Sequence, residues 1–183
     1  MRCSSTNRCW PAPRSIGIVR FHLAQVNVSR LLEPLGSVRL RPFVERLERV
    51  NAAADAAPGF VWRLQTDDGD ATAVRVFDDA EMIVNLSVWA TLDALREFAY
   101  RDALHVEVLR RRREFFTRDD EATLALWWIE AGTFPSVGDA EARLTLLRAI
   151  GPSPDAFTFK RSFPPRGSDA APVDDDRELC PAP

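Results

Sequence analysis

Hydrophobic and polar residues follow two different periods along this chain. Runs that alternate, or that are rich in Val, Ile and Trp, have the period of a half-buried or buried strand. Segments in which apolar residues return every three or four positions have the period of an amphipathic helix. The strands predicted in this way are residues 21–28, 60–65, 82–89 and 124–129, and the predicted helices are residues 42–54, 92–116 and 139–150.

Residues with strong local preferences support these limits. Pro42 suits the first turn of the first helix, and Pro58-Gly59 ends that helix. Thr91 is a good N-cap for the long second helix. Gly151-Pro152 closes the last helix, and the segment at residues 157–163 beyond it, which contains three phenylalanines, predicts an extra edge strand.

The order of these elements is β-α-β-β-α-β, followed by a C-terminal helix and an edge segment. This order predicts an α+β fold of the split βαβ, or ferredoxin-like, kind, with an antiparallel sheet and helices on one face. The opposite face would be apolar and needs a cover, because an exposed apolar face of that size aggregates. A second copy is the simplest cover, so we expect a homodimer. The domain is expected to span residues 21–165, between disordered tails at residues 1–20 and 166–183.

Composition and charge narrow the class of protein. The chain is 46% hydrophobic, which is enough to fill a core. No window approaches the roughly 20 uninterrupted apolar residues that a membrane-spanning helix needs, so no membrane is expected as a partner. The N-terminus lacks the apolar stretch of a secretory signal, which makes the cytoplasm the expected location. A net charge of −3 gives no electrostatic reason to expect nucleic acid as a partner.

The sequence also lacks the pattern of a metal or cofactor site. The cysteines, Cys3, Cys9 and Cys180, all fall in the predicted tails, which argues against a disulfide framework. With His22 and His105 as the only histidines, no Cys/His cluster has the spacing of a structural zinc site. We therefore expect neither a metal nor a cofactor.

Several segments together carry a family resemblance. They are His22–Asn27, Pro58–Leu64, Val84–Trp89 and His105–Arg112, with Trp127–Ile129 and Ala156–Phe159 further on. In these segments the chain resembles an uncharacterised bacterial family, labelled only as a domain of unknown function. That family is similar to the dimeric α/β-barrel superfamily, whose members include antibiotic-biosynthesis monooxygenases and haem-degrading enzymes. The resemblance implies a cavity between sheet and helices, and it implies no particular reaction.

His105 is the first candidate for chemistry. At about 100° per residue around the predicted long helix, His105 lies near Phe98 and Phe116, at the edge of the apolar stripe. Asp102, three residues earlier, is placed to accept a hydrogen bond from one ring nitrogen. Such a carboxylate would raise the pKa of the imidazole and fix its tautomer, so His105 and Asp102 are the predicted catalytic pair. The alternative is a structural histidine at a helix–sheet boundary.

Four consecutive arginines, Arg110 to Arg113, fan around the end of the same predicted helix. Arg110 and Arg113 fall near its apolar stripe and could reach a carboxylate, including that of a ligand. The ordinary alternative is a solvated run of charge that complements the helix dipole.

Polar residues on two predicted strands form the second candidate site. By alternation, Gln25 shares a face with Asn27, and Asn85 shares a face with Ser87 and Trp89. If these are the same face of the sheet, amides and a hydroxyl converge in an otherwise apolar cavity, which is the composition of a small-molecule site. Asn27, Asn85 and Ser87 are therefore predicted to bind ligand. The alternative is that they link strand edges or the seam of a dimer.

Aromatic residues complete the predicted site. Trp62, Phe98 and Trp127 are expected to contribute to ligand binding, although tryptophans in such positions more often fill a core. Trp127 and Trp128 are neighbours in one strand, so their side chains must lie on opposite faces of the sheet.

Haem is a further alternative that the resemblance raises. Superfamily haem degraders are similar in carrying an Asn, an aromatic residue and a His at places comparable to Asn27, Phe98 and His105. The aromatic residue here is Phe where the haem degraders have Trp, and the interval to His105 is shorter. Both departures, together with the poor value of a lone His as a haem signature, weaken this assignment.

The resemblance and the candidate residues together predict an uncharacterised α/β-barrel protein that binds a small, largely apolar organic molecule. One interpretation is a cofactor-independent monooxygenase-like or isomerase-like enzyme with His105 as its base. The competing interpretation is a non-catalytic ligand-binding protein or structural homodimer. A cavity of roughly several hundred Å³ lined by Asn27, Asn85 and His105 would favour the enzyme, and a filled cavity would favour the second class.

Overall fold

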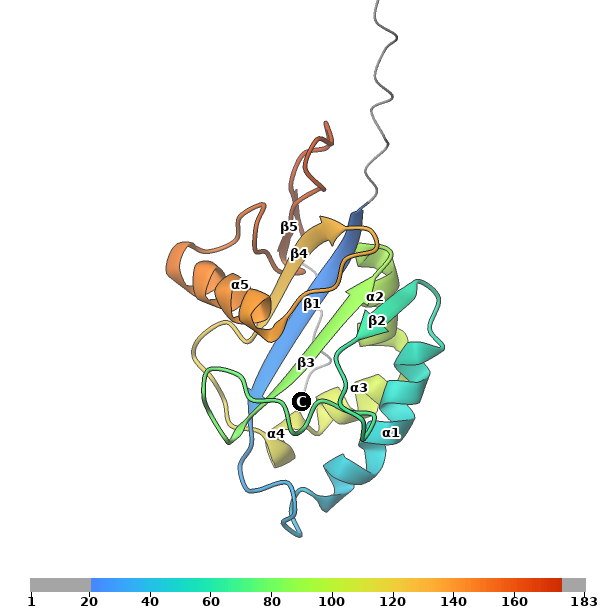
Figure 1. Ribbon diagram of the computed structural model, residues 1–183, viewed down its shortest axis with the longest axis vertical. Coiled ribbons are helices and arrows are strands. Elements are labelled where there is room, and N and C mark those ends of the chain that lie inside the picture. Colours follow the sequence, from blue (N-terminus) through green and yellow to red (C-terminus); the bar gives the residue numbers. More distant parts are fainter. Residues whose placement is uncertain (1–20, 176–183) are drawn as a thin grey trace, which may run out of the picture.

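The computed structural model describes residues 21–175, with helices on both sides of a four-stranded sheet (Figure 1). The strand order is β2-β3-β1-β4, and every neighbouring pair is antiparallel. The predicted α+β class is therefore confirmed. The strands are β1 (Phe21–Arg30), β2 (Phe60–Arg63), β3 (Met82–Trp89) and β4 (Leu124–Glu130), close to the four predicted runs.

The register of the strands decides which side chains share a face of the sheet. Val26 of β1 lies opposite Leu86 of β3 and Ala125 of β4, and these residues form one face. The next residue, Asn27, lies opposite Asn85 on the other face, because side chains alternate along a strand. We name each face after a helix that covers it: the first is the α5 face (α5, Val137–Ile150) and the second is the α2 face (α2, Leu92–Arg101).

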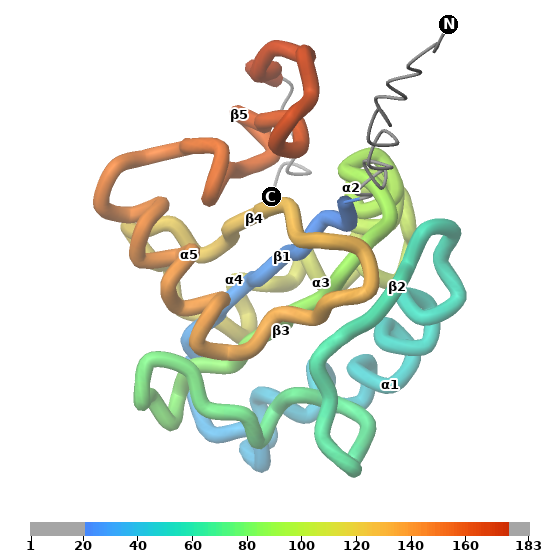
Figure 2. The backbone as a smooth tube through the Cα atoms, turned by 45° about the horizontal axis from the view of Figure 1, so that its top comes forward, coloured from blue at the N-terminus to red at the C-terminus, as the bar shows by residue number. Residues whose placement is uncertain are grey.

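Helix α5 lies across the α5 face, on the side of the sheet away from α2 (Figures 1 and 2). A capping box starts this helix: Ser136 Oγ accepts the backbone N–H of Asp139, and the Asp139 carboxylate accepts the N–H of Ser136. Leu144 of α5 is fully buried in one cluster with Val26 and Trp127. The prediction that helices cover only one face of the sheet is therefore wrong.

This cover removes the argument on which the homodimer was predicted. Val26, Leu86 and Trp127 on the α5 face are 0%, 1% and 2% exposed within a single chain. A dimeric barrel places two sheets face to face and would need this face free. The homodimer stays a prediction, without support from the topology.

On the α2 face, three helices stand where one long helix was predicted. Thr91 caps the first of them as predicted, since its side chain accepts the N–H of Ala94 at 3.0 Å. The chain then turns out of helical geometry at Asp102 (φ −65°, ψ 124°), whose carboxylate accepts the N–H of His105 at 2.9 Å and caps the next helix. The helices are α2, α3 (Ala103–Arg110) and α4 (Arg112–Phe115).

Helix α1 (Arg41–Asp55) packs beside α3 and α4 and leads to β2 through a turn at Gly59. Phe43 at its start lies in contact with Phe115, with ring centroids 5.7 Å apart. Gly59 has φ +82°, and a Cβ at this position would lie 2.6 Å from the Cβ of Ala94. The turn therefore requires glycine both for its backbone conformation and for its close approach to α2.

The C-terminal part of the described chain departs from prediction. Residues 157–163 add no regular strand to the main sheet: Phe157 exchanges two backbone hydrogen bonds of 2.8 Å with Leu126 as an isolated bridge. Beyond it, β5 (Arg161–Ser162) pairs with β6 (Val173–Asp174) in a separate two-stranded sheet. Within residues 166–175, predicted as part of a tail, Arg166 pairs with Asp155, β6 pairs with β5, and Asp175 pairs with Arg96. The predicted tails at 1–20 and 176–183, with all three cysteines, lie outside the described residues.

Candidate functional site

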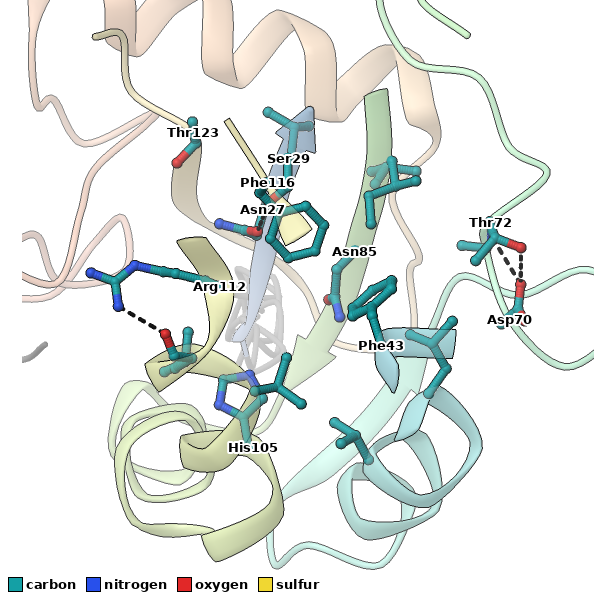
Figure 3. Close-up of a pocket in the computed structure, with 18 of the residues that line it drawn as sticks. Asn27, Ser29, Phe43, Asp70, Thr72, Asn85, His105, Arg112, Phe116 and Thr123 are labelled. Carbon is teal, nitrogen blue, oxygen red and sulfur yellow. Dashed lines mark hydrogen bonds between the residues drawn. The ribbon is translucent and has the colours of Figure 1, made fainter. Parts of the chain in front are cut away.

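A pocket of about 510 Å³ lies between the α2 face of the sheet and helices α1, α3 and α4 (Figure 3). Apolar side chains form much of its wall, including Phe43 of α1, Val108 of α3 and Phe116 just after α4. The strands supply polar groups to its floor, and the pocket continues around β3 to the loop that follows β2. A mostly apolar hollow of this size with a few polar groups matches the general composition of small-molecule sites.

The floor of the pocket contains the two predicted amides. Asn27 and Asn85 are direct cross-strand partners on the α2 face, as are Gln25 and Ser87, so the two polar pairs do share one face. Asn85 is exposed although it lies in the interior strand β3, which means that no other part of residues 21–175 packs over it. Its amide has no hydrogen-bond partner among these residues, and Asn27 Oδ1 accepts only from Ser29 Oγ, at 3.3 Å.

Ser87 lies outside this floor, in a buried network. Its hydroxyl donates to Gln25 Oε1 at 2.8 Å and accepts the indole N–H of Trp89 at 2.9 Å. Ser87 and Gln25 are 6% and 7% exposed, and neither lines the pocket. The structure therefore gives these two side chains the alternative role, which is to link β1 to β3.

His105 borders the pocket from α3, and its ring projects toward the strands (Figure 3). Its Nδ1 lies 2.8 Å from the carbonyl oxygen of Ala99. Because a carbonyl can only accept, Nδ1 carries the proton, and in the neutral ring Nε2 keeps its lone pair. Burial lowers the pKa of His105, although the Ala99 carbonyl and the Asp102 charge oppose that shift. The ring is therefore neutral at pH 7, with Nε2 as a proton acceptor.

The predicted pairing of Asp102 with the imidazole of His105 is wrong. The Asp102 carboxylate accepts the backbone N–H of His105. The ring of His105 instead forms its hydrogen bond with the carbonyl oxygen of Ala99. The predicted rise in the pKa of His105 is wrong for a related reason, since burial outweighs the weak attraction of the carboxylate. Both errors come from treating residues 92–116 as one helix, in which Asp102 would be an ordinary helical side chain.

The aromatic candidates lie behind the pocket or on the other side of the sheet. Phe98 sits between Trp89 and His105, with ring centroids 5.2 and 5.0 Å away, and supports His105 without lining the pocket. Trp62 and Trp127 belong to the α5 face, where Trp62 stacks on Phe134 at 5.3 Å. None of the three therefore lies where a molecule in this pocket would touch it.

The adjacent tryptophans of β4 do face opposite ways, as predicted. Trp127 pairs with Ala24 on the α5 face, and Trp128 pairs with Leu23 on the α2 face. The indole N–H of Trp128 donates to the carbonyl of Phe163 at 2.7 Å. Both residues are parts of the packed core.

The sequence reasoning missed several pocket residues because the predicted long helix is broken. After each break, the side chains point in directions that differ from those of one continuous helix. Arg113 lines the pocket as the pattern predicts, but Arg112 lines it in place of Arg110. The reason is Arg111 (φ −91°, ψ 3°), which ends α3 and shifts the direction of the residues after it. The residues of α1 that line the pocket were also missed, because nothing in the sequence pattern of α1 indicates that it packs beside α3 and α4.

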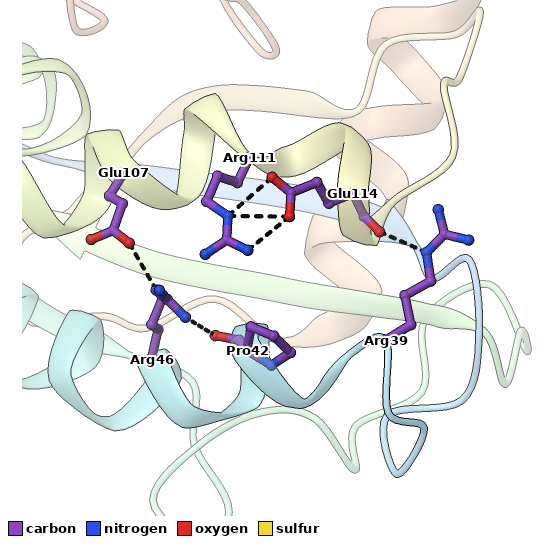
Figure 4. Close-up of polar contacts among 6 residues, drawn as sticks. All are labelled: Arg39, Pro42, Arg46, Glu107, Arg111 and Glu114. Atoms are coloured by element: carbon purple, nitrogen blue, oxygen red, sulfur yellow. Dashed lines mark hydrogen bonds and ion pairs between the residues drawn. The ribbon is translucent and has the colours of Figure 1, made fainter.

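Polar contacts join α1 and the segment before it to α3 and α4 along the outside of the pocket (Figure 4). Arg46 donates to Glu107 Oε1 at 3.0 Å, and Arg39 donates to the carbonyl of Glu114 at 2.9 Å. Arg111 holds the Glu114 carboxylate with hydrogen bonds as short as 2.7 Å, and this contact lowers the pKa of Glu114. These contacts are largely exposed, so each contributes little to stability, and those of Arg39 and Arg46 cross from the α1 side of the pocket to the α3–α4 side.

Fold and site together define an α+β domain with a four-stranded antiparallel sheet and a pocket on one of its faces. The chain belongs to the family described as a domain of unknown function, DUF3291, which it matches over residues 22–173. A comparison with curated proteins finds no match. Across residues 21–175 there is no group of three or more His, Cys, Asp or Glu side chains placed to hold a metal ion, and no helix long and apolar enough to cross a membrane.

Two solved structures are similar to this chain at low sequence identity. PA3566 from Pseudomonas aeruginosa is 11% identical with a TM-score of 0.42, and the match covers 64% of this chain and 100% of that one. The NE2512 protein of unknown function from Nitrosomonas europaea is 10% identical with a TM-score of 0.40, covering 63% of this chain and 96% of that one.

Proposed function

We propose that this chain is a small-molecule-binding protein of the ferredoxin-like class whose ligand is a small, largely apolar organic molecule. The antiparallel strand order β2-β3-β1-β4 supports that class, because the split βαβ arrangement has this order. The observation that carries the binding proposal is Asn85. A polar side chain left uncovered in the interior of a sheet, beneath a pocket of about 510 Å³, marks a place that the protein keeps open.

Binding is tested with N-phenyl-1-naphthylamine, a neutral dye whose fluorescence rises in an apolar site. The native protein is expected to give a saturable rise. Asn85→Trp, which fills the floor of the pocket, is expected to abolish it. Val173→Trp is the matched control, because Val173 is 58% exposed and does not line the pocket. Equal dye binding by all three proteins would reject the proposal.

A second candidate function is proton transfer by His105. The neutral ring, with its proton held on Nδ1 by Ala99, leaves Nε2 as a base beside the pocket. In an isomerase-like reaction, Nε2 would take a proton from a carbon next to a carbonyl group and return it to another atom of the same molecule, so no cofactor is consumed. A monooxygenase-like reaction would use the same first step and would need dioxygen as a second substrate: the carbanion would take one oxygen atom and become a carbonyl group, and the other oxygen atom would leave as water, with the substrate supplying the electrons.

The catalytic and non-catalytic alternatives differ in what His105 does to a bound molecule. Native mass spectrometry of protein purified from its own host would reveal a retained ligand and the oligomeric state together. His105→Gln is then expected to keep dye binding and to lose turnover of the recovered molecule. If the native protein leaves that molecule unchanged over long incubation, the protein is a binding module and His105 is structural.

A further inference from the structure

The charged residues that line the pocket are unequally distributed between its two ends. Five arginines and two aspartates take part in the lining. One end, at α1 and the loop after β2, contains both signs of charge in close pairs. The other end, at α4 and the segment after it, contains more arginine than acid. The charged lining residues are Arg46, Arg63, Arg112, Arg113, Arg118, Asp70 and Asp119.

At the first end, the protein satisfies its own charges. Arg46 is paired with Glu107 at 3.0 Å, and Arg63 is paired with Asp55 at 2.8 Å. Asp70 accepts both the N–H and the hydroxyl of Thr72, at 2.8 and 2.7 Å. A ligand would have to displace these contacts in order to use the charges, so this end offers little to an ion.

At the α4 end, the arginines have no such partners. Within residues 21–175, none of Arg112, Arg113 and Arg118 has a carboxylate within ion-pair distance. Arg112 uses one N–H on the carbonyl of Leu109, at 2.8 Å, and keeps the others. Thr117, which lines the same end, has a buried hydroxyl oxygen without a hydrogen-bond partner in this part of the chain.

From this asymmetry we infer that the ligand is an amphipathic carboxylate, bound with its acid group at the α4 end and its apolar body over Asn27 and Asn85. The inference rests on the proposed function, since it concerns the same pocket. Guanidinium groups match carboxylates in shape and donate two parallel hydrogen bonds to them. Arg112 and Thr123 lie on the same side of the pocket, beyond the strand that holds Asn27 (Figure 3). The acid would therefore meet several donors at once.

The test compares two molecules that differ only in the acid group, octanoate and 1-octanol, as competitors of the bound dye. Octanoate is expected to displace the dye from the native protein at a concentration about tenfold lower than 1-octanol requires. A factor of about ten corresponds to the free energy of one charge-assisted hydrogen bond. In Arg113→Gln/Arg118→Gln, this preference is expected to fall, because Arg112 is then the one arginine left at this end of the pocket, while 1-octanol competes as before. Arg49→Gln/Arg110→Gln removes the same charge from exposed positions outside the pocket and is expected to keep the preference.

The outcomes separate this inference from the proposed function. Dye binding with no preference for octanoate would overturn the inference and leave the pocket intact, as would an equal loss in both double variants. Octanoate is also titrated by calorimetry without dye. If the dye fails to bind, the heat of octanoate binding decides: a signal that is reduced in both Arg113→Gln/Arg118→Gln and Asn85→Trp supports the inference, a signal reduced in the arginine variant alone overturns it, and no signal overturns the inference and the proposed function together.

Discussion

Replacing Asp102 by alanine tests how the break between α2 and α3 positions His105. The Asp102 carboxylate accepts the His105 N–H at 2.9 Å, in the geometry of an N-cap. Loss of such a cap costs about 1 kcal/mol of the free energy of unfolding, within a range of roughly 0.5–2 kcal/mol. Because residue 102 is not helical, alanine brings no helix propensity to offset this cost. For a domain of this length, the loss corresponds to a fall of about 2–4 °C in Tm.

The assay is urea unfolding followed by circular dichroism, with Asp102→Asn as the matched variant. Asparagine caps helices about as well as aspartate and removes the charge, so Asp102→Asn is expected to stay within a few tenths of a kcal/mol of the native protein. The two variants together separate capping from charge. If asparagine destabilised as much as alanine, or if alanine had no effect, the cap would not be what fixes this break.

The same pair of variants examines the imidazole. The charge of Asp102 contributes a small rise to a pKa that burial lowers overall. Removing the charge is therefore expected to lower the pKa of His105 further, by a small amount, in a titration followed by NMR. A large change in Asp102→Asn would instead indicate the direct ring contact that the sequence suggested.

Three further predictions concern the histidine, the tight turn and the cover of the sheet. Because the folded pKa of His105 lies below its ordinary value of 6.5, the unfolded state binds the proton first, and stability is expected to fall as pH drops from about 6.5 toward the folded pKa. Urea unfolding from pH 7.5 to 5 measures this loss, and His105→Gln should lack it. Gly59→Ala is expected to cost about 1–3 kcal/mol from its positive φ and the contact with Ala94, and Ala94→Gly in the same chain should recover part of it in urea unfolding. Leu144→Ala, at a fully buried site of α5, is expected to cost about 2–5 kcal/mol in the same assay, and a loss below 1 kcal/mol would mean that α5 does not cover the sheet as described.

The strands were predictable because the alternation of apolar and polar residues along a strand follows directly from which side chains are buried. Val26 and Val28 are buried, and the residues between and beside them alternate to the other face, as the sequence indicates. The alternation of side chains also assigned Asn27 to one face of its strand and Asn85 to one face of its own strand. The register shows that these are the same face of the sheet. The pairing itself depends on which strands become neighbours, and no local pattern contains that information.

The helical side of the site was less predictable, for two physical reasons. The pattern of apolar residues allows Asp102 to lie inside one long helix. In the structure its carboxylate instead accepts the backbone N–H of His105, which caps a new helix. This break and the one at Arg111 rotate everything after them, which puts Arg112 into the pocket. The position of α5 on the opposite face is a tertiary choice, since an amphipathic helix fits either face of a sheet.

Two contacts about one turn apart near the start of α1 attach it to the neighbouring helices by different forces. At Phe43 the contact is aromatic and buried, whereas farther along the helix Arg46 meets Glu107 in a partly solvated ion pair. Dissolved ions shorten the reach of such pairs, from about 10 Å at 0.1 M to about 3 Å at 1 M, and leave aromatic contacts in place. Concentrated salt should thus weaken the contact of α1 with α3 at Glu107 and leave its contact with α4 at Phe115, so the wall of the pocket would become more mobile beside α3 than beside α4.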